Sequence, residues 1–253
     1  MNIGVFVNVR TGSQRLTNKH FRTINHTPIL TILLERLNNR ISRISHDAKL
    51  TLIITTGEYH TNHLFNEIAK ALDLHIFYGS NDNIPYRHLQ ACEHYGLDAA
   101  ISIDGDDIIP SIEALTETVA ALFEDKSLVT TFGLPIGMNV HGYGASTLKN
   151  VMRGIEQNRL ETGWMQIFDS YERYQITYTE FQKYNVIRAT LDYDDDLKFF
   201  ERIIQEIENW ETLSTNSICD EILKRKIYKE NSHLHNQYWK FHNEQKKQEN
   251  IKG

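Results

Sequence analysis

Residues 3–19, IGVFVNVRTGSQRLTNK, decide how the rest of this sequence is interpreted. The first seven are mostly apolar and rich in branched side chains, which is typical of a strand buried on both faces. The next ten contain one glycine, hydroxyl side chains and three cations. Small residues let backbone N–H groups approach phosphates, and cations offset the charge of a leaving pyrophosphate. The stretch therefore predicts a polyphosphate site, although composition alone would also fit a solvated basic loop.

The bulk composition indicates one large globular domain. The chain has 253 residues, of which 40% are hydrophobic and 24% are charged. These values are ordinary for a soluble protein of this size. The formal net charge of -6 argues against a general binder of nucleic acid or of anionic membranes. We therefore expect neither nucleic acid nor membrane as a partner.

The cysteines and the apolar runs bear on the compartment. Cys92 and Cys219 are far apart and lie in no metal-like spacing, so no disulfide framework is predicted. The chain starts with a strand pattern rather than a signal-peptide pattern. No apolar run approaches the roughly 20 residues that span a bilayer. These features lead us to expect a cytoplasmic protein.

Strand-like and helix-like segments alternate over the first 132 residues. Short branched apolar runs predict strands, and apolar residues at helical spacing predict helices. The predicted strands are 3–9, 50–55, 75–78, 99–103 and 128–132, and the predicted helices follow residue 28 and span 60–72, 85–95 and 111–123. This alternation predicts a doubly wound, mostly parallel, Rossmann-like α/β sheet. Ligands of such sheets bind beyond the carboxyl ends of the strands.

The regular alternation of strand-like and helix-like segments ends in the second half of the chain. Glycines and aromatic residues are dense between about 133 and 190, which indicates a small β-rich excursion that cannot contain a long helix. Amphipathic helices are predicted again over 196–210 and 217–228. The last residues are polar and have few apolar anchors. We therefore expect one domain over residues 1–230 and a solvated polar tail over 231–253.

The order of residues in the first loop adds a resemblance. It resembles the nucleotide-binding loop of cytidylyltransferases that make CMP-activated sugar acids, such as CMP-Kdo and CMP-sialate synthetases. It looks closest to the branch called spore-coat polysaccharide biosynthesis protein F. That family opens with a pattern like A-R-x-G-S-x-R-L-P-G-K, which this chain matches at Arg10, Gly12, Ser13, Arg15, Leu16 and Lys19. Thr17 and Asn18 replace the family's Pro-Gly pair.

The resemblance implies a specific role for this loop. The fold would be of the nucleotide-diphospho-sugar transferase type, and CTP would be the nucleotide. The loop residues implied to contact it are Arg10, Thr11, Gly12, Ser13, Arg15 and Lys19.

The fourth predicted strand ends in Asp104-Gly105-Asp106-Asp107. Carboxylates this close repel one another unless a cation or a proton intervenes. Mg²⁺ fits because it binds one or two carboxylates together with phosphate oxygens and water. A solvated turn that caps the next helix is the alternative. The family pattern V-x-G-D-x-P-L-I aligns with Gly105 and Asp106, which implies that Asp106 is a magnesium ligand.

A second acidic segment lies near residue 192. Residues 189–197, ATLDYDDDL, resemble the family's late L-D-x-P-E-D-L pattern, which implies Asp192 as the second magnesium ligand. In isolation, the acidic run would be interpreted as a solvated helix start. A weaker resemblance to the family's terminal N-S-H motif occurs at Asn231-Ser232-His233.

Residues 78–87, YGSNDNIPYR, follow the third predicted strand. They resemble the family's G-S-x-D-D-V-L-x-R segment, which lies near the nucleotide. The resemblance implies that Ser80, Asp82 and Arg87 contact it. Equally, Asp82 would serve as a helix cap and Arg87 would face solvent.

The resemblance implies transfer of CMP from CTP to a sugar acid or a related anionic acceptor, with release of pyrophosphate. Arg15, Lys19 and Asp106 would be the catalytic residues, and the protein would be a homodimer that serves polysaccharide or glycoconjugate synthesis. A GT-A-type glycosyltransferase that holds its metal through Asp104-Gly105-Asp106 is the alternative from another reaction class. The chain lacks the family's Arg-Glu-His triplet, so a non-catalytic nucleotide-binding homologue also stays open.

Overall fold

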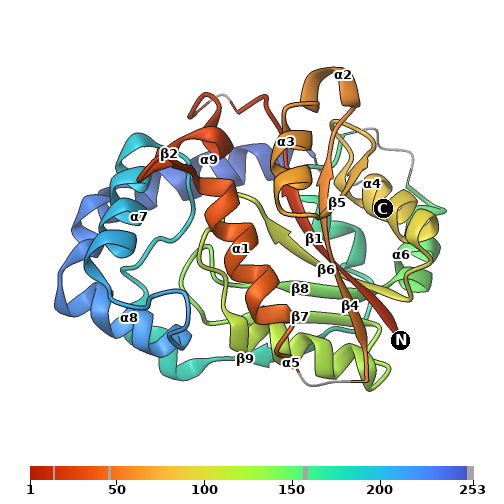
Figure 1. Cartoon of the computed structure of the whole chain (residues 1–253). Coiled ribbons are helices and arrows are strands. Elements are labelled where there is room, and N and C mark those ends of the chain that lie inside the picture. Colours follow the sequence, from red (N-terminus) through yellow and green to blue (C-terminus); the bar gives the residue numbers. More distant parts are fainter. Residues whose placement is uncertain (14, 45–46, 156–158, 250–253) are drawn as a thin grey trace.

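The computed structural model of this chain describes residues 1–13, 15–44, 47–155 and 159–249. Within these residues, the main sheet has seven strands in the order β5-β4-β1-β6-β8-β7-β9 (Figure 1). The strands are β1 (Asn2–Val9), β4 (Lys49–Thr56), β5 (His75–Tyr78), β6 (Ala99–Asp104), β7 (Leu128–Phe132), β8 (His141–Gly144) and β9 (Tyr174–Thr177). A separate two-stranded ribbon joins β2 (Thr23–Ile24) to β3 (Thr27–Pro28).

The first half of the chain forms a parallel sheet, as predicted. Strand β1 pairs in parallel with both β4 and β6, and β4 pairs in parallel with β5. The helices between strands are α1 (Ile29–Ile41), α2 (Tyr59–Asn62), α3 (Phe65–Ala71), α4 (Ile84–Tyr95) and α5 (Ile112–Phe123). The α/β, mostly parallel fold class is therefore confirmed, and the five predicted strands agree with the structure to within one residue at either end.

The region between 133 and 190 extends this sheet. Strand β8 runs antiparallel between β6 and β7, and β9 pairs in parallel with β7. The region also contains α6 (Ala145–Met152) and the 3-10 helices η2 (Trp164–Phe168) and η3 (Thr179–Tyr184). The expected β-rich excursion is thus a mixed segment whose strands complete the main sheet.

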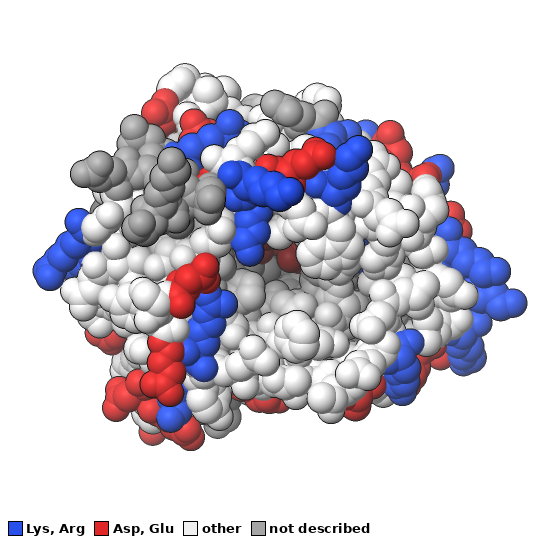
Figure 2. Space-filling model, turned by 180° about the vertical axis from the view of Figure 1, so that it is seen from behind, with Lys and Arg blue, Asp and Glu red and all other residues white. Residues whose placement is uncertain are grey.

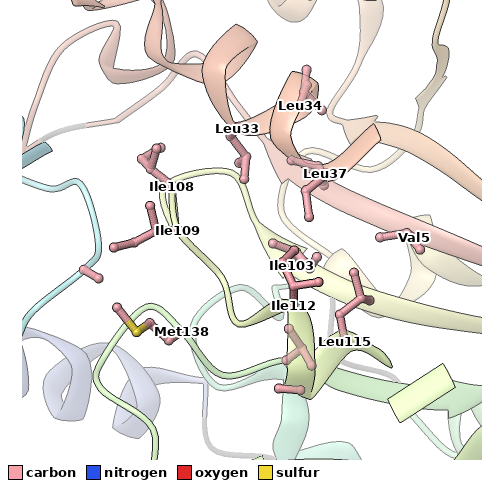
Figure 3. Close-up of a cluster of buried hydrophobic side chains, with 14 of the residues drawn as sticks. Val5, Leu33, Leu34, Leu37, Ile103, Ile108, Ile109, Ile112, Leu115 and Met138 are labelled. Carbon is pink, nitrogen blue, oxygen red and sulfur yellow. The ribbon is translucent and has the colours of Figure 1, made fainter. Parts of the chain in front are cut away.

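Alternation along β1 divides the core into two layers. Ile3, Val5 and Val7 belong to one buried cluster, whereas Phe6 points to the opposite face and joins another. Helices α1 and α5 cover the first face, and α4 and α6 cover the second. Figure 3 shows part of the first cluster, where side chains of α1 lie near those of β6 and α5. Two buried faces explain why the strand pattern is continuously apolar.

One predicted helix, 60–72, is divided in the structure. It is broken between α2 and α3, where the side chain of Asn62 donates a hydrogen bond to the Glu58 carbonyl at 3.0 Å. Asparagine side chains compete with helical backbone bonds in this way. By contrast, the predicted helix at 111–123 is confirmed with Ser111 as its cap, since the Ser111 Oγ accepts from the Ala114 N–H at 3.1 Å.

The end of the described chain is helical. Helices α7 (Asp194–Glu206) and α8 (Thr215–Lys224) are followed by the 3-10 turns η4 (Ile227–Glu230) and η5 (Ser232–Leu234), and then by α9 (His235–Gln248). The segment that the sequence predicts as a solvated tail is helical over 235–248, and none of the residues of α9 is buried. Helix α9, blue in Figure 1, lies behind the red segment that follows β1, and the Arg15 guanidinium is 4.3 Å from the Phe241 ring centroid. Among the described residues, no helix has the length and apolar character needed to cross a membrane.

Candidate functional site

A cavity of about 510 Å³ lies beyond the carboxyl ends of β1 and β6. Distant parts of the chain contribute to its lining, among them Arg10, Gly12, Ser13, Arg15 and Lys19 after β1, Arg87 on α4, Asp104, Asp106 and Asp107 at β6, Glu161 and Thr162, Asp192 before α7, and Phe241, His242 and Gln245 on α9. Figure 2 shows a hollow on the face behind that of Figure 1, with acidic atoms in its depth and basic atoms at its rim. This is the edge at which open α/β sheets bind ligands.

The loop after β1 bends inward at Asn18. Its backbone has φ 53° and ψ 34°, the left-handed conformation that glycine adopts freely and asparagine tolerates better than most other residues. Asn18 can therefore adopt this turn although it carries a side chain. The turn starts the short 3-10 helix η1 (Lys19–Phe21), in which Lys19 is only 8% exposed.

Gly105 lets the β6 turn approach β1 closely. A Cβ at this position would lie 2.7 Å from the Asn8 carbonyl oxygen and 2.4 Å from Val9 Cγ1. The Gly105 N–H donates to the same Asn8 carbonyl at 2.8 Å. Because only glycine fits here without displacing the backbone, the side chain of Asp106 is held directly beside the first loop.

The two predicted metal ligands meet at one cation. The Lys19 Nζ donates to Asp106 Oδ2 and also lies 3.5 Å from Asp192 Oδ1. Burial alone would lower the pKa of Lys19, but the charges of Asp106 and Asp192 raise it above its ordinary value. Burial would likewise raise the pKa of Asp106, but the charge and hydrogen bond of Lys19 lower it to about 2. Both groups are therefore ionised at neutral pH.

Asp192 is held by buried partners. It is 1% exposed, and its Oδ2 accepts from Arg188 Nη2 at 2.9 Å, while its Oδ1 lies 2.5 Å from Arg15 Nη2. Asp196 accepts from the Arg188 Nε at 3.1 Å and from the backbone N–H of Asp192 at 2.8 Å. Asn231, from the N-S-H resemblance, donates to Asp196 Oδ1 at 2.8 Å. The acidic run is thus an internal network that fixes Asp192, and not only a solvated helix start.

A second polar network fixes Asp104. Asn8 Nδ2 donates to Ser102 Oγ at 2.8 Å and to Asp104 Oδ1 at 3.2 Å. The Asn8 Oδ1 accepts from Thr55 Oγ1 at 2.8 Å and contacts His88 Nε2 at 2.5 Å. All the hydrogen-bonding capacity of this amide is therefore used, which locks its orientation.

The network has consequences for two ionisable groups. Burial, aided by the charge of Arg87, lowers the pKa of His88 well below its ordinary value, so the ring is neutral. Asp104 keeps contact with water through the cavity, but the surrounding protein and the neighbouring Asp106 raise its pKa to about 6.

The other predicted nucleotide contacts are only partly brought together. Arg10 lines the cavity and pairs with Glu161 at 2.5 Å. Arg87 lines it too, and is 2% exposed rather than solvated; its Nη1 donates to the Ser80 carbonyl at 2.9 Å. Thr11 contacts Asn62 through its backbone N–H at 3.1 Å.

Ser80 and Asp82 have local contacts instead. The Ser80 Oγ accepts from the Asn83 N–H at 3.2 Å, and the Asp82 carbonyl accepts from the Leu160 N–H at 2.7 Å. Among the described residues that form the walls of the cavity, Thr11, Ser80 and Asp82 do not appear. Their contact with a nucleotide stays a prediction.

A second cavity, of about 640 Å³, adjoins the first. The residues that line both are Asp104, Asp107, Gly137, Thr162, Trp164, Tyr238 and His242. Sequence reasoning missed Tyr238, Phe241 and His242, because they lie in a polar segment without a periodic apolar stripe. Three aromatic side chains in that segment, Tyr238, Trp239 and Phe241, are the signal that could have revealed its contact with the site.

The donor set fits a magnesium ion. In the parts of the chain that the structure describes, no three His, Cys, Asp or Glu side chains form a preassembled metal cluster. Mg²⁺, however, needs only one or two protein carboxylates when phosphates and water complete its coordination. Asp106 and Asp192 supply two carboxylates that already share one cation, Lys19.

Comparison with known proteins gives relatives at low identity. No family model matches the chain. Over 205 residues it is 27% identical to the uncharacterized protein MJ1063 of Methanocaldococcus jannaschii, which covers 79% of this chain and 82% of that protein.

Solved structures show the fold more clearly. A cytidylyltransferase from Leptospira borgpetersenii serovar Hardjo-bovis superposes with a TM-score of 0.75 at 20% identity, over 89% of this chain and 95% of that one. CMP:2-keto-3-deoxy-manno-octonic acid synthetase in complex with CTP gives 0.59 at 11% identity, over 81% and 98%. A nucleotidyl transferase from Methanothermobacter gives 0.53 at 14%, over 78% and 93%. The chain therefore has the fold shared by these nucleotidyltransferases.

Proposed function

We propose that this protein is a cytidylyltransferase that transfers CMP from CTP to a sugar acid or a related anionic acceptor and releases pyrophosphate. The observation that carries the proposal is the convergence of Arg15, Lys19, Asp106 and Asp192 in one cavity. Two cations and two carboxylates from distant segments are the groups that a metal-loaded triphosphate requires. The fold shared with a cytidylyltransferase and with a CTP-bound synthetase supports the choice of reaction.

In the proposed reaction an acceptor oxygen attacks the α-phosphorus of CTP. A new P–O bond forms, the bond to the pyrophosphate oxygen breaks, and the acceptor loses its proton. Arg15 and Lys19 would bind the β- and γ-phosphates, together with backbone N–H groups near Gly12 and Ser13. Asp106 and Asp192 would hold Mg²⁺, which when bound neutralises charge on the phosphates. Positioning and charge stabilisation supply most of the rate in such transfers.

The acceptor would occupy the second cavity. Trp164 and Tyr238 lie at the junction of the two cavities, and Arg173 and Lys246 add cations to the second one. Aromatic faces and cations suit an anionic sugar. The homodimer and the role in polysaccharide or glycoconjugate synthesis belong to the same proposal and rest on the sequence resemblance.

The test combines binding with turnover. With Mg²⁺, CTP should raise the melting temperature more than ATP, GTP or UTP does, since a ligand that binds the native state stabilises it. CTP together with a sugar acid should then release pyrophosphate. Release of a nucleoside diphosphate from a nucleotide sugar would instead show a glycosyltransferase. Binding of CTP without turnover on any acceptor would show a non-catalytic homologue.

A further inference from the structure

Helix α9 crosses the opening of the proposed active site. Tyr238 and His242 stand between the two cavities, and Phe241 and Gln245 face the first of them. None of the residues of α9 is buried, so the helix has little apolar anchoring of its own. A helix without a buried face gains little stability from packing. Something other than core packing must therefore hold it over the cavity.

The residue that follows α9 differs from the helix in its exposure. Glu249 is 2% exposed, although it follows a helix in which nothing is buried. Its carboxylate accepts from the N–H groups of Glu161 at 3.0 Å, Thr162 at 3.1 Å and Gly163 at 2.7 Å. A buried carboxylate is tolerated only when such bonds replace water. These three amides therefore form an anion-binding nest, which Glu249 fills.

The nest is shaped for close approach. A Cβ at Gly163 would lie 2.3 Å from Gln166 Nε2 and 3.3 Å from Lys246 Cγ, both closer than ordinary packing, and 3.4 Å from Glu249 Oε2. Thr162 lines both cavities, and Gly163 lines the second. Two of the three residues whose amides hold Glu249 therefore line the cavity proposed for the acceptor, and the third, Glu161, lines the first cavity.

Two aromatic rings of α9 contact cations, one in the cavity and one in the network that holds Asp192. The Arg15 guanidinium lies 4.3 Å from the Phe241 ring centroid, and that of Arg188 lies 4.6 Å from the Tyr238 ring centroid. A triphosphate that binds Arg15 would compete with the first of these contacts. The docked position of α9 and a bound triphosphate would thus both use the Arg15 side chain.

We propose that α9 is an autoinhibitory strap, that Glu249 is its latch, and that the carboxylate of an acidic acceptor takes the place of Glu249 in the nest of 161–163. The role of Glu249 as a latch is inferred only from its own contacts in the structure. The identity of the displacing group rests on the proposed function. The ligand chemistry is a carboxylate, because the nest already binds one through three N–H groups.

The latch is tested first without any ligand. Hydrogen–deuterium exchange is followed in the full-length wild type, in Glu249→Gln and in Glu244→Gln. Glu244 is an exposed glutamate on the same helix and provides a matched loss of one charge. Amides of 235–248 should exchange at least about tenfold faster in Glu249→Gln and at the wild-type rate in Glu244→Gln. Unchanged exchange in Glu249→Gln, or equal acceleration in both variants, would overturn the strap.

The displacing group is tested by hydrogen–deuterium exchange in the wild type and by the affinity of Glu249→Gln for the same acid. The probes are 2-keto-3-deoxy-manno-octonic acid and N-acetylneuraminic acid, each compared with its methyl ester, and inorganic phosphate. At least one free acid should accelerate exchange of 235–248, and Glu249→Gln should bind that acid about five- to tenfold more tightly. No effect of either acid, or an equal effect of the ester or of phosphate, would overturn carboxylate displacement.

Failure of the proposed function would be visible separately. A wild type that releases no pyrophosphate but shows the exchange difference between Glu249→Gln and Glu244→Gln would keep the strap and lose the cytidylyltransferase. Full turnover without that exchange difference would keep the cytidylyltransferase and overturn the strap.

Discussion

The two segments that face each other across the cavity, the loop after β1 and helix α9, are built in opposite ways. The loop places Lys19 at 8% exposure between two carboxylates, in a turn that starts at Asn18, and Gly105 lets the turn after β6 approach β1 closely. Helix α9 buries none of its residues and contacts the site through aromatic rings and the Glu249 latch. The loop and its acidic partners thus form a preorganised site, whereas α9 has no buried residue, and we expect it to leave the site at small cost in free energy.

This contrast shows where rigidity is needed. Charge that develops on a phosphate is best stabilised by groups that need not reorganise during the reaction. A segment over the opening must instead move for ligands to enter. The variants below test whether the difference in construction is also a difference in energy.

The largest effect on the free energy of unfolding is expected in the buried network around Asp192. Arg188→Met leaves the buried Asp196 without its cation and removes one of the three cations around Asp192. It should therefore lower the free energy of unfolding by about 3–5 kcal/mol. Arg202→Met is the control, because Arg202 pairs with Glu206 and Glu230 at 31% side-chain exposure. Such a partly exposed pair should contribute about 1 kcal/mol or less. Urea denaturation measures the free energy of unfolding of both variants. Equal decreases would show that the buried network stabilises the fold no more than the partly exposed pair does.

The next effect concerns turnover. Arg15→Ala and Asp106→Ala should each lower kcat for pyrophosphate release by about 100- to 1000-fold, since each removes a group that faces the developing charge. Arg22→Ala is the control from the same segment, as its side chain is 41% exposed and pairs with Asp194. Near-wild-type release by either of the first two variants would take that residue out of the mechanism.

A smaller effect should depend on pH. The pKa of Asp104 is raised to about 6, above about 3.9 for an unfolded chain, so its ionisation destabilises the fold as pH rises from about 4 to 6. Asp104→Asn should therefore raise the melting temperature at pH 7.5 and leave it nearly unchanged at pH 4, in EDTA and without nucleotide.

Asp106 gives the opposite sign in the same measurement. Its pKa is lowered to about 2, so its stabilising contribution is present above about pH 4 and is lost as pH falls toward 2. Asp106→Asn should lower the melting temperature at pH 7.5. A decrease for Asp104→Asn at pH 7.5 would contradict the opposed roles of the two carboxylates.

The smallest effect on stability is expected on α9. Phe241→Ala removes the ring beneath Arg15 and should cost about 0.5–1 kcal/mol or less, as for cation–π contacts at accessible positions. Exchange of 235–248 should accelerate a few-fold, while the rest of the chain keeps its protection. Global destabilisation comparable to that of Arg188→Met would show that α9 belongs to the core.

The sequence by itself determined the alternation of strands and helices, the buried first strand, and the groups that follow the ends of β1 and β6. Those features are local: apolar periodicity, turn residues and strand ends are visible within a few positions. Only the tertiary structure decided that Asp192 meets Lys19, that Arg188 and Asn231 hold the acidic run, and that α9 covers the cavity. These depend on how distant elements pack. A polar helix with no buried residue of its own carries no periodic apolar signal from which its position over the cavity could be inferred.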